Sequence, residues 1–141
     1  MGSRRQSGYK SPNEDSARYQ DYVIRDGRLI GKFEEMYRNS SEIPWHQDVT
    51  ANSIFSDLTI AILRRTKIVS MLDVGSGLGY MTERMRRELP GLSRVVGLDI
   101  SETAVLRARQ MFKEIEFVSG TMTDLKGTEL FNAVVSKDVI W

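Results

Sequence analysis

Apolar residues along this chain fall into short runs separated by polar or glycine-rich segments. The run from Ile68 to Val74 lacks the alternation of a half-buried strand, which indicates a strand covered on both faces in a parallel sheet. Runs of similar character predict further strands at 94–100, 115–118 and 131–136. Apolar residues at helical spacing predict helices at 51–65, 80–89 and 102–113. Strands that alternate with helices are typical of an α/β fold with a parallel sheet.

The first of these helices carries an apolar stripe along one side. We expect this stripe to cover one face of the sheet, with Thr50 or Asn52 as the N-cap of the helix. Arg64 and Arg65 suit the negative C-terminal end of the helix. The stripe consists of Ile54, Phe55, Leu58, Ala61 and Ile62.

The pattern divides the chain into a polar tail, an arm or cap, and an α/β part, at residues 1–17, 18–50 and 51–141. The tail has no hydrophobic periodicity, which predicts disorder. In the arm, Asp26-Gly27 lies between two runs that carry apolar residues, and this arrangement favours a hairpin. A short helix ending near Asn39 should follow, with an apolar face formed by Phe33, Met36 and Tyr37.

A glycine-rich turn follows the first strand of the predicted sheet, in the sequence Asp73-Val74-Gly75-Ser76-Gly77-Leu78-Gly79-Tyr80. Its three glycines allow a tight turn and a close approach of the backbone to a ligand. Backbone N–H groups of the turn and the next helix then face a crevice at the carboxyl end of a strand, where α/β sheets bind ligands. Asp73 would repel a diphosphate and attract an ammonium group. Tyr80 stands where the dinucleotide fingerprint requires a third glycine or alanine.

Asp99 ends the second strand of the predicted sheet. An acidic side chain at this place can accept hydrogen bonds from the two hydroxyls of a ribose. The alternative is an aspartate that caps a helix or a turn. Since Ser101 is the better N-cap candidate and Glu102 already supplies negative charge to the first helical turn, we expect Asp99 to be available for a ligand.

The run Asp-x-Gly-x-Gly-x-Gly at 73–79 resembles motif I of the class I S-adenosylmethionine-dependent methyltransferases, in which this loop holds the methionine end of the cofactor. The loop 119–125 resembles the adenine loop of that family, with Thr121 where an aspartate is usual. Asp124 in this loop either bonds the adenine amino group or caps the next turn. The segment 131–136 resembles motif IV, with Asn132 in place of an aspartate.

The resemblance implies a three-layer α/β sandwich with a Rossmann-like parallel sheet, in the order 3-2-1-4 for the strands present. It implies S-adenosylmethionine as cofactor and methyl transfer to a small-molecule N or O nucleophile. The residues that it implies for cofactor binding are Asp73, Gly75, Ser76, Gly77, Gly79, Asp99, Ile100, Thr121, Met122 and Ser136. Two rival interpretations are an NAD-binding oxidoreductase domain and a binding module without catalysis.

Trp45, His46 and Lys137 are candidates for contact with a substrate. Trp45 either packs the arm onto the domain or belongs to the substrate site, and Lys137 either orients a substrate or lies at the rim. His46 is the only histidine. It is the candidate general base because its ordinary pKa lies near neutrality.

Composition narrows the choice of partners. Lys and Arg number 20 and Asp and Glu number 19, a formal net charge of +1, which gives no reason to expect a nucleic acid or an anionic membrane. The lack of cysteine and the single histidine argue against disulfides and a metal site. No apolar run approaches the ~20 residues that span a bilayer, and no secretory signal is visible, so we expect a cytoplasmic protein.

The last predicted strand lacks neighbours in the sequence. Its continuous apolar run, Ala133 to Val135, should be covered on both faces and paired at its outer edge. The sequence that follows supplies neither a further strand nor a helix. We therefore expect a fragment, a naturally truncated protein or a chain completed by a partner, with self-association through the fourth strand as one route to completion.

Overall fold

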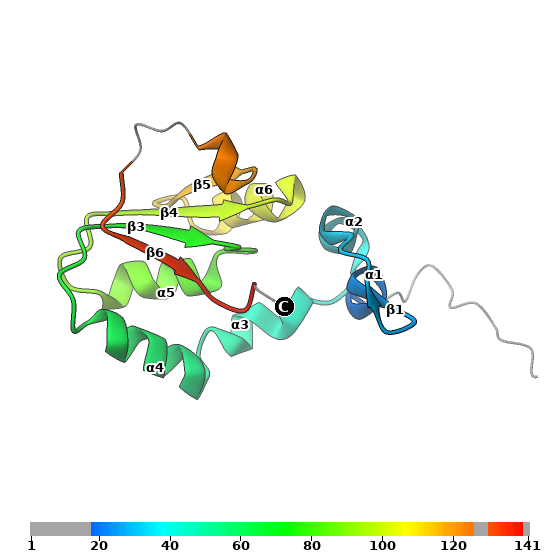
Figure 1. Ribbon diagram of the computed structural model, residues 1–141, viewed down its shortest axis with the longest axis horizontal. Coiled ribbons are helices and arrows are strands. Elements are labelled where there is room, and N and C mark those ends of the chain that lie inside the picture. The colour runs from blue at the N-terminus through cyan, green and yellow to red at the C-terminus, as the bar shows by residue number, and fades with distance from the viewer. Residues whose placement is uncertain (1–17, 126–129, 140–141) are drawn as a thin grey trace, which may run out of the picture.

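A computed structural model of the protein describes residues 18–125 and 130–139. The predicted disordered tail at 1–17 lies outside the described residues. The centre of the fold is a parallel sheet of four strands in the order β5-β4-β3-β6 (Figure 1). The strands are β3 (Ser70–Val74), β4 (Arg94–Asp99), β5 (Glu116–Ser119) and β6 (Ala133–Ser136). Counted along this sheet the order is 3-2-1-4, so the predicted Rossmann-like α/β fold is confirmed.

The two faces of the sheet bury different residues. On one face Met71 packs in a core cluster with side chains of α4 (Ile54–Leu63), α5 (Tyr80–Glu88) and α6 (Glu102–Met111). On the other face Leu72 clusters with Val96 and Leu98, against Leu125 and Phe131. This second cluster contains no residue of the three helices. The described part of the chain therefore contains the sheet and one helical layer of the predicted three-layer sandwich.

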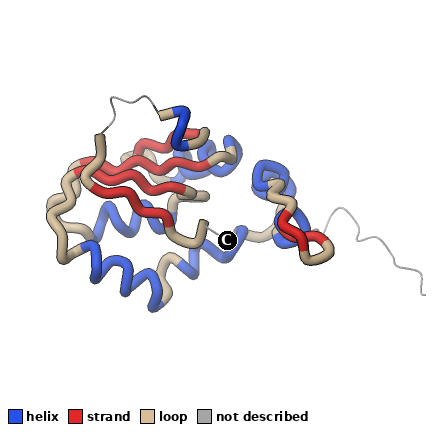
Figure 2. The backbone as a smooth tube through the Cα atoms, in the orientation of Figure 1, coloured by secondary structure: helices blue, strands red, loops and turns tan. Residues whose placement is uncertain are grey.

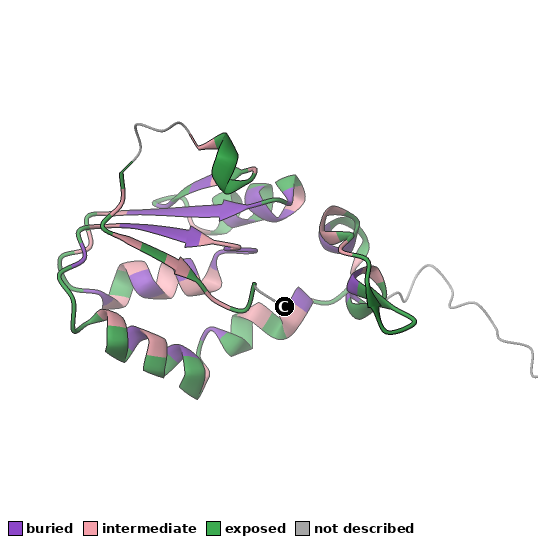
Figure 3. Ribbon diagram, in the orientation of Figure 1, coloured by how far each residue is buried: buried purple, intermediate pink, exposed green. Residues whose placement is uncertain are grey.

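The orientation of α4 differs from the prediction. The helix packs through the buried side chains of Ser56 and Ile60, whereas Ile54 and Phe55 are 76% and 72% exposed. Figure 3 shows how much of α4 is exposed. The N-cap is Ser53, whose hydroxyl accepts a hydrogen bond from the backbone of Ser56, and neither Thr50 nor Asn52 has this role. The predicted stripe therefore faces away from the sheet. Helical spacing shows that one side of a helix is apolar, but not what that side contacts.

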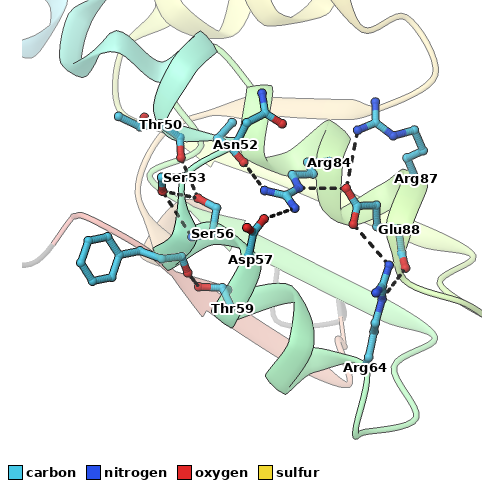
Figure 4. A network of polar contacts seen from close by, with 12 residues as sticks. Thr50, Asn52, Ser53, Ser56, Asp57, Thr59, Arg64, Arg84, Arg87 and Glu88 are labelled. Carbon is cyan, nitrogen blue, oxygen red and sulfur yellow. Dashed lines mark hydrogen bonds and ion pairs between the residues drawn. The ribbon is translucent and has the colours of Figure 1, made fainter.

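Polar contacts hold α4 in this orientation (Figure 4). The side chain of Arg84 on α5, only 12% exposed, donates to Asp57 (2.5 Å), to Glu88 (2.8 Å) and to the carbonyl of Ala51 (2.7 Å). Arg64 at the end of α4 donates to the carbonyl and the carboxylate of Glu88, at 3.2 and 3.3 Å. These bonds join both ends of α4 to α5, and so fix which side of α4 meets the sheet.

The arm precedes this α/β part and lies beside the carboxyl ends of the strands (Figure 2). Its hairpin is confirmed, because two short strands pair in antiparallel and Asp26 and Gly27 at the turn have positive φ angles of 51° and 72°. The predicted short helix is also confirmed. The arm consists of α1 (Gln20–Val23), β1 (Ile24–Arg25), β2 (Arg28–Leu29), α2 (Phe33–Asn39), a 3₁₀ turn (Pro44–His46) and α3 (Gln47–Thr50).

Two features are absent from the described residues. None of the helices there is long and apolar enough to cross a membrane. Over the same residues, no group of three or more histidine, aspartate and glutamate side chains is placed to hold a metal ion.

Candidate functional site

A cavity of about 340 Å³ lies where the carboxyl ends of the strands meet the arm. The strand ends, the arm, the helices α4 and α5 and the segment that follows β6 all contribute residues to it. The lining includes residues 73–76, 98–100 and 120–122, the arm residues Phe33, Tyr37, Trp45 and Gln47, and residues 137–139. A cavity at this edge of a parallel sheet is the usual place for a ligand in such folds.

The structure brings most of the predicted site residues to this one cavity. Those that line it are Asp73, Gly75, Ser76, Asp99, Ile100, Thr121, Met122, Trp45 and Lys137. Gly77, Gly79, Ser136 and His46 are not among the described residues that line it. The arm residues Phe33, Tyr37 and Gln47 also line the cavity and were not predicted as site residues. The first two carried only a packing signal, and Gln47 carried none.

The glycine loop is closed by the protein's own side chains. Gly75, Gly77 and Gly79 have positive φ angles of 76°, 53° and 83°, which other residues rarely adopt. A Cβ atom at Gly75 would lie 2.2 Å from a methyl of Val139, and one at Gly79 would lie 2.5 Å from the ring of Phe117. The close approach that these glycines permit is therefore an approach to neighbouring parts of the chain.

The backbone N–H groups of the loop are also occupied. Those of Gly75 and Ser76 donate to the carbonyl of Leu98, at 2.7 and 3.0 Å. Further along, the N–H of Gly77 donates to the Asp99 carboxylate (2.8 Å) and that of Gly79 to the Ser76 carbonyl (2.9 Å). Between them, the N–H of Leu78 donates to the side chain of Gln47 (2.8 Å). Five consecutive N–H groups are thus bonded within the protein.

Asp99 is less available than predicted, because both carboxylate oxygens accept backbone hydrogen bonds. One accepts from Gly77 and the other from Ser101, at 2.8 and 2.9 Å. Burial raises the pKa of Asp99, and these two bonds oppose that shift. Ser101 is the N-cap of α6 as predicted, accepting from the backbone of Ala104. A carboxylate has about four lone-pair positions, so Asp99 can still accept from a ligand hydroxyl.

Asp73 is the most perturbed acid of the cavity. Its side chain is almost fully buried, and one oxygen accepts a hydrogen bond from the Thr82 hydroxyl at 2.5 Å. Burial raises the pKa of Asp73 to about 7, and the negative charge of Asp99 adds to the rise, while the Thr82 bond and the charge of Lys137 oppose it. A cation in the cavity would favour the ionised form of this carboxyl. Lys137 itself is ion-paired with Asp138.

Two large apolar side chains belong to the wall of the cavity. Ile100 and Met122 both line it, and each is 57% exposed. In the same loop Asp124 accepts hydrogen bonds from the backbone and the hydroxyl of Thr121, both at 2.7 Å. These bonds lower the pKa of Asp124. Of the two alternatives for Asp124, the structure therefore shows the cap of a turn.

Trp45 packs between the arm and the domain, which is the first of the two roles that the sequence left open, and its contact with a substrate stays a prediction. Its ring packs against Tyr19, Phe33 and Tyr37, with centroid distances of 5.6, 6.2 and 6.4 Å, and it also lines the cavity. Trp45 and His46 have left-handed φ angles of 53° and 48°, a conformation that costs energy outside glycine. His46 is exposed, lies edge-on to Tyr19 and stays outside the cavity lining, so its role as a base stays a prediction.

Comparison with known proteins identifies the class. Residues 71–141, which are 71 of the 141 residues, match a family model described as a methyltransferase domain. The chain therefore belongs to this methyltransferase domain family, and its sheet order is that of the Rossmann-like class I fold. A search of curated proteins returns no match.

Three solved structures are similar in fold. DesVI of Streptomyces venezuelae is 28% identical, with a TM-score of 0.50, and the match covers 64% of this chain and 36% of that one. The plantazolicin methyltransferase BpumL in complex with SAH is 24% identical (TM-score 0.50, 84% and 44% covered). A TehB-like SAM-dependent methyltransferase from Corynebacterium glutamicum is 23% identical (TM-score 0.50, 65% and 50% covered). The chain spans between about a third and a half of the length of these proteins.

Proposed function

We propose that the cavity binds S-adenosylmethionine and that the chain is the cofactor-binding part of a methyltransferase acting on a small-molecule N or O nucleophile. The observation that carries the proposal is that two buried carboxylates, Asp73 and Asp99, line the same cavity as the exposed apolar side chains of Ile100 and Met122. The side chains that line the cavity match the chemical groups of the cofactor. A carboxylate suits the ammonium group and the ribose hydroxyls, and Ile100 and Met122 suit the flat adenine ring.

In this proposal the residues of the chain hold the cofactor and orient the substrate. When bound, S-adenosylmethionine supplies a methyl group already activated by its sulfonium. The protein then has to align the nucleophile with that methyl group, and such alignment can lower a barrier by ~7–11 kcal/mol. Trp45 and Lys137 line the cavity and are the proposed contacts to the substrate. Ser136 and the candidate base His46 keep the roles expected from the sequence only as predictions.

The occupied glycine loop argues against the NAD-binding rival. A dinucleotide site uses free N–H groups at the turn to bind the diphosphate. Here the five N–H groups from Gly75 to Gly79 already donate to acceptors of the protein. A negatively charged diphosphate would also lie beside Asp73 and Asp99, which is unfavourable.

The second candidate function is a cofactor-binding module that is incomplete or non-enzymatic. The outer edge of the sheet favours it, because in the described residues β6 pairs only with β3 and Val134 is 56% exposed. The same edge supports the proposal of self-association, since an open strand edge is a template for pairing. Light scattering of the purified chain tests self-association. Formation of S-adenosylhomocysteine with small amines and phenols as acceptors distinguishes an enzyme from a module.

Isothermal titration calorimetry tests the cofactor assignment. We expect S-adenosylmethionine to bind the wild-type chain and NAD not to bind. The substitution Asp73→Asn should weaken the binding of S-adenosylmethionine. Asp48→Asn makes the same chemical change at an exposed residue of the arm and should leave the affinity for S-adenosylmethionine unchanged. Binding of NAD in preference to S-adenosylmethionine would exclude the proposal.

A further inference from the structure

The side chain of Gln47 lies at the place on the glycine loop where dinucleotide-binding folds hold a diphosphate. In those folds the second glycine of the fingerprint lets the backbone approach the pyrophosphate. The second glycine here is Gly77. A Cβ atom on Gly77 would lie 2.6 Å from both the Nε2 and the Oε1 atom of Gln47, and 2.7 Å from the hydroxyl oxygen of Tyr37. The space in front of Gly77 is therefore filled by the arm.

Hydrogen bonds fix Gln47 in this position. Its Oε1 atom accepts from the backbone N–H of Leu78 at 2.8 Å, and its Nε2 atom donates to the Tyr37 hydroxyl at 2.7 Å. Leu78 directly follows Gly77, so its N–H is a donor that a phosphate oxygen would use. An uncharged amide oxygen from the arm takes the place of that phosphate oxygen. Gln47 and Tyr37 also line the cavity.

We propose that Gln47 is a specificity-determining residue, which blocks the phosphate position of the glycine loop and restricts the cavity to nucleoside ligands without a phosphate at that point. This inference rests on the proposed function, because it assumes that the cavity holds the adenosine part of a cofactor. The proposed action of Gln47 differs from that of Asp73. The carboxylate of Asp73 disfavours any anion in the cavity, whereas Gln47 occupies one hydrogen-bond donor and the space before it.

Adenosine and ADP form a matched pair of probes, because they differ only by the diphosphate. Calorimetry with the wild-type chain should show that adenosine binds more tightly than ADP. In Gln47→Ala the N–H of Leu78 and the part of the space at Gly77 that Gln47 fills become free. We expect the affinity for ADP relative to adenosine to rise about tenfold, the effect of one hydrogen bond to a charged acceptor. Gln47→Glu keeps an oxygen on the Leu78 N–H, and its ADP-to-adenosine ratio should not rise above that of the wild type.

The outcomes separate this inference from the function on which it rests. If the wild-type chain binds neither adenosine nor S-adenosylmethionine, the proposed function fails and this inference fails with it. If adenosine binds but the ratio in Gln47→Ala equals the wild-type ratio, the role of Gln47 alone is overturned. Circular dichroism checks the fold of each variant, and Gln47→Ser is the second variant. Wild-type protein that binds ADP as tightly as adenosine overturns the inference without any variant.

Discussion

The substitution Asp73→Asn should stabilise the ligand-free protein while weakening its affinity for the cofactor. The pKa of Asp73 is raised from 3.8 to about 7 in the folded chain. A raised pKa means that the contribution of this group to stability is fully present below pH 3.8 and is lost as the pH rises to about 7. The ionised carboxylate therefore destabilises the wild-type fold at pH 8. An asparagine of the same shape carries no charge and can still accept from Thr82.

The size of the effect follows from the same two pKa values. Each pH unit between them changes the free energy of unfolding by about 1.4 kcal/mol. The advantage of Asp73→Asn over the wild type should therefore grow by roughly 2–3 kcal/mol between pH 5 and pH 8, whatever the fixed cost of burying the amide. For the ligand, loss of a charged hydrogen-bond partner should raise the Kd for S-adenosylmethionine about 10–100-fold.

Urea unfolding at pH 5 and pH 8 measures the first effect, and calorimetry at pH 8 measures the second. Asp48→Asn serves as the control in both assays, because Asp48 is exposed and outside the cavity lining. A stability difference that does not change between pH 5 and pH 8 would refute the reasoning, since it would show that Asp73 is already ionised at pH 5 in the folded protein.

Two further substitutions test how the arm and the helices are held. Glu34 of the arm accepts from the Ser101 hydroxyl (2.6 Å) and from the backbone and hydroxyl of Thr103 (3.1 and 2.6 Å). Burial raises its pKa, but these bonds prevail and lower it to about 2, so its stabilising effect is present above pH 4.5 and is lost as the pH falls towards 2. Glu34→Gln should cost about 1–2 kcal/mol in urea unfolding at pH 7, and no loss would show that the arm is held by its apolar contacts alone. Arg84→Met should cost about 1–3 kcal/mol, whereas the control Arg87→Met, at an exposed ion pair of 3.7 Å, should change stability by less than about 0.5 kcal/mol. Equal effects of the two arginine substitutions would contradict the buried role of Arg84.

The sheet and the meeting of Asp73 with Asp99 could be predicted from the sequence. Uninterrupted apolar runs indicate buried parallel strands, and neighbouring parallel strands end at the same edge of a sheet. Side chains at the ends of β3 and β4 must therefore lie close together, whatever the details of packing. The Asp-Gly turn of the arm was predictable for a similar reason, because its positive φ angles suit few residue types.

The contacts of the arm could not be predicted in this way. Gln47 bonds to Leu78, 31 residues further on, and Glu34 bonds to Ser101, 67 residues further on. No local pattern marks a residue for a contact at such a distance. The direction of the apolar stripe on α4 was missed because its rotation depends on Arg84, a residue of another helix.

The central claim is that the carboxylate of Asp73 meets the ammonium group of the cofactor. The most direct measurement is the number of protons released on binding, obtained by calorimetry at pH 7 in buffers of different ionisation enthalpy. With a pKa of about 7, Asp73 is half protonated before binding and becomes ionised beside a cation. Wild-type protein should therefore release about half a proton more per S-adenosylmethionine than Asp73→Asn does. Equal proton release by the two proteins would contradict the claim.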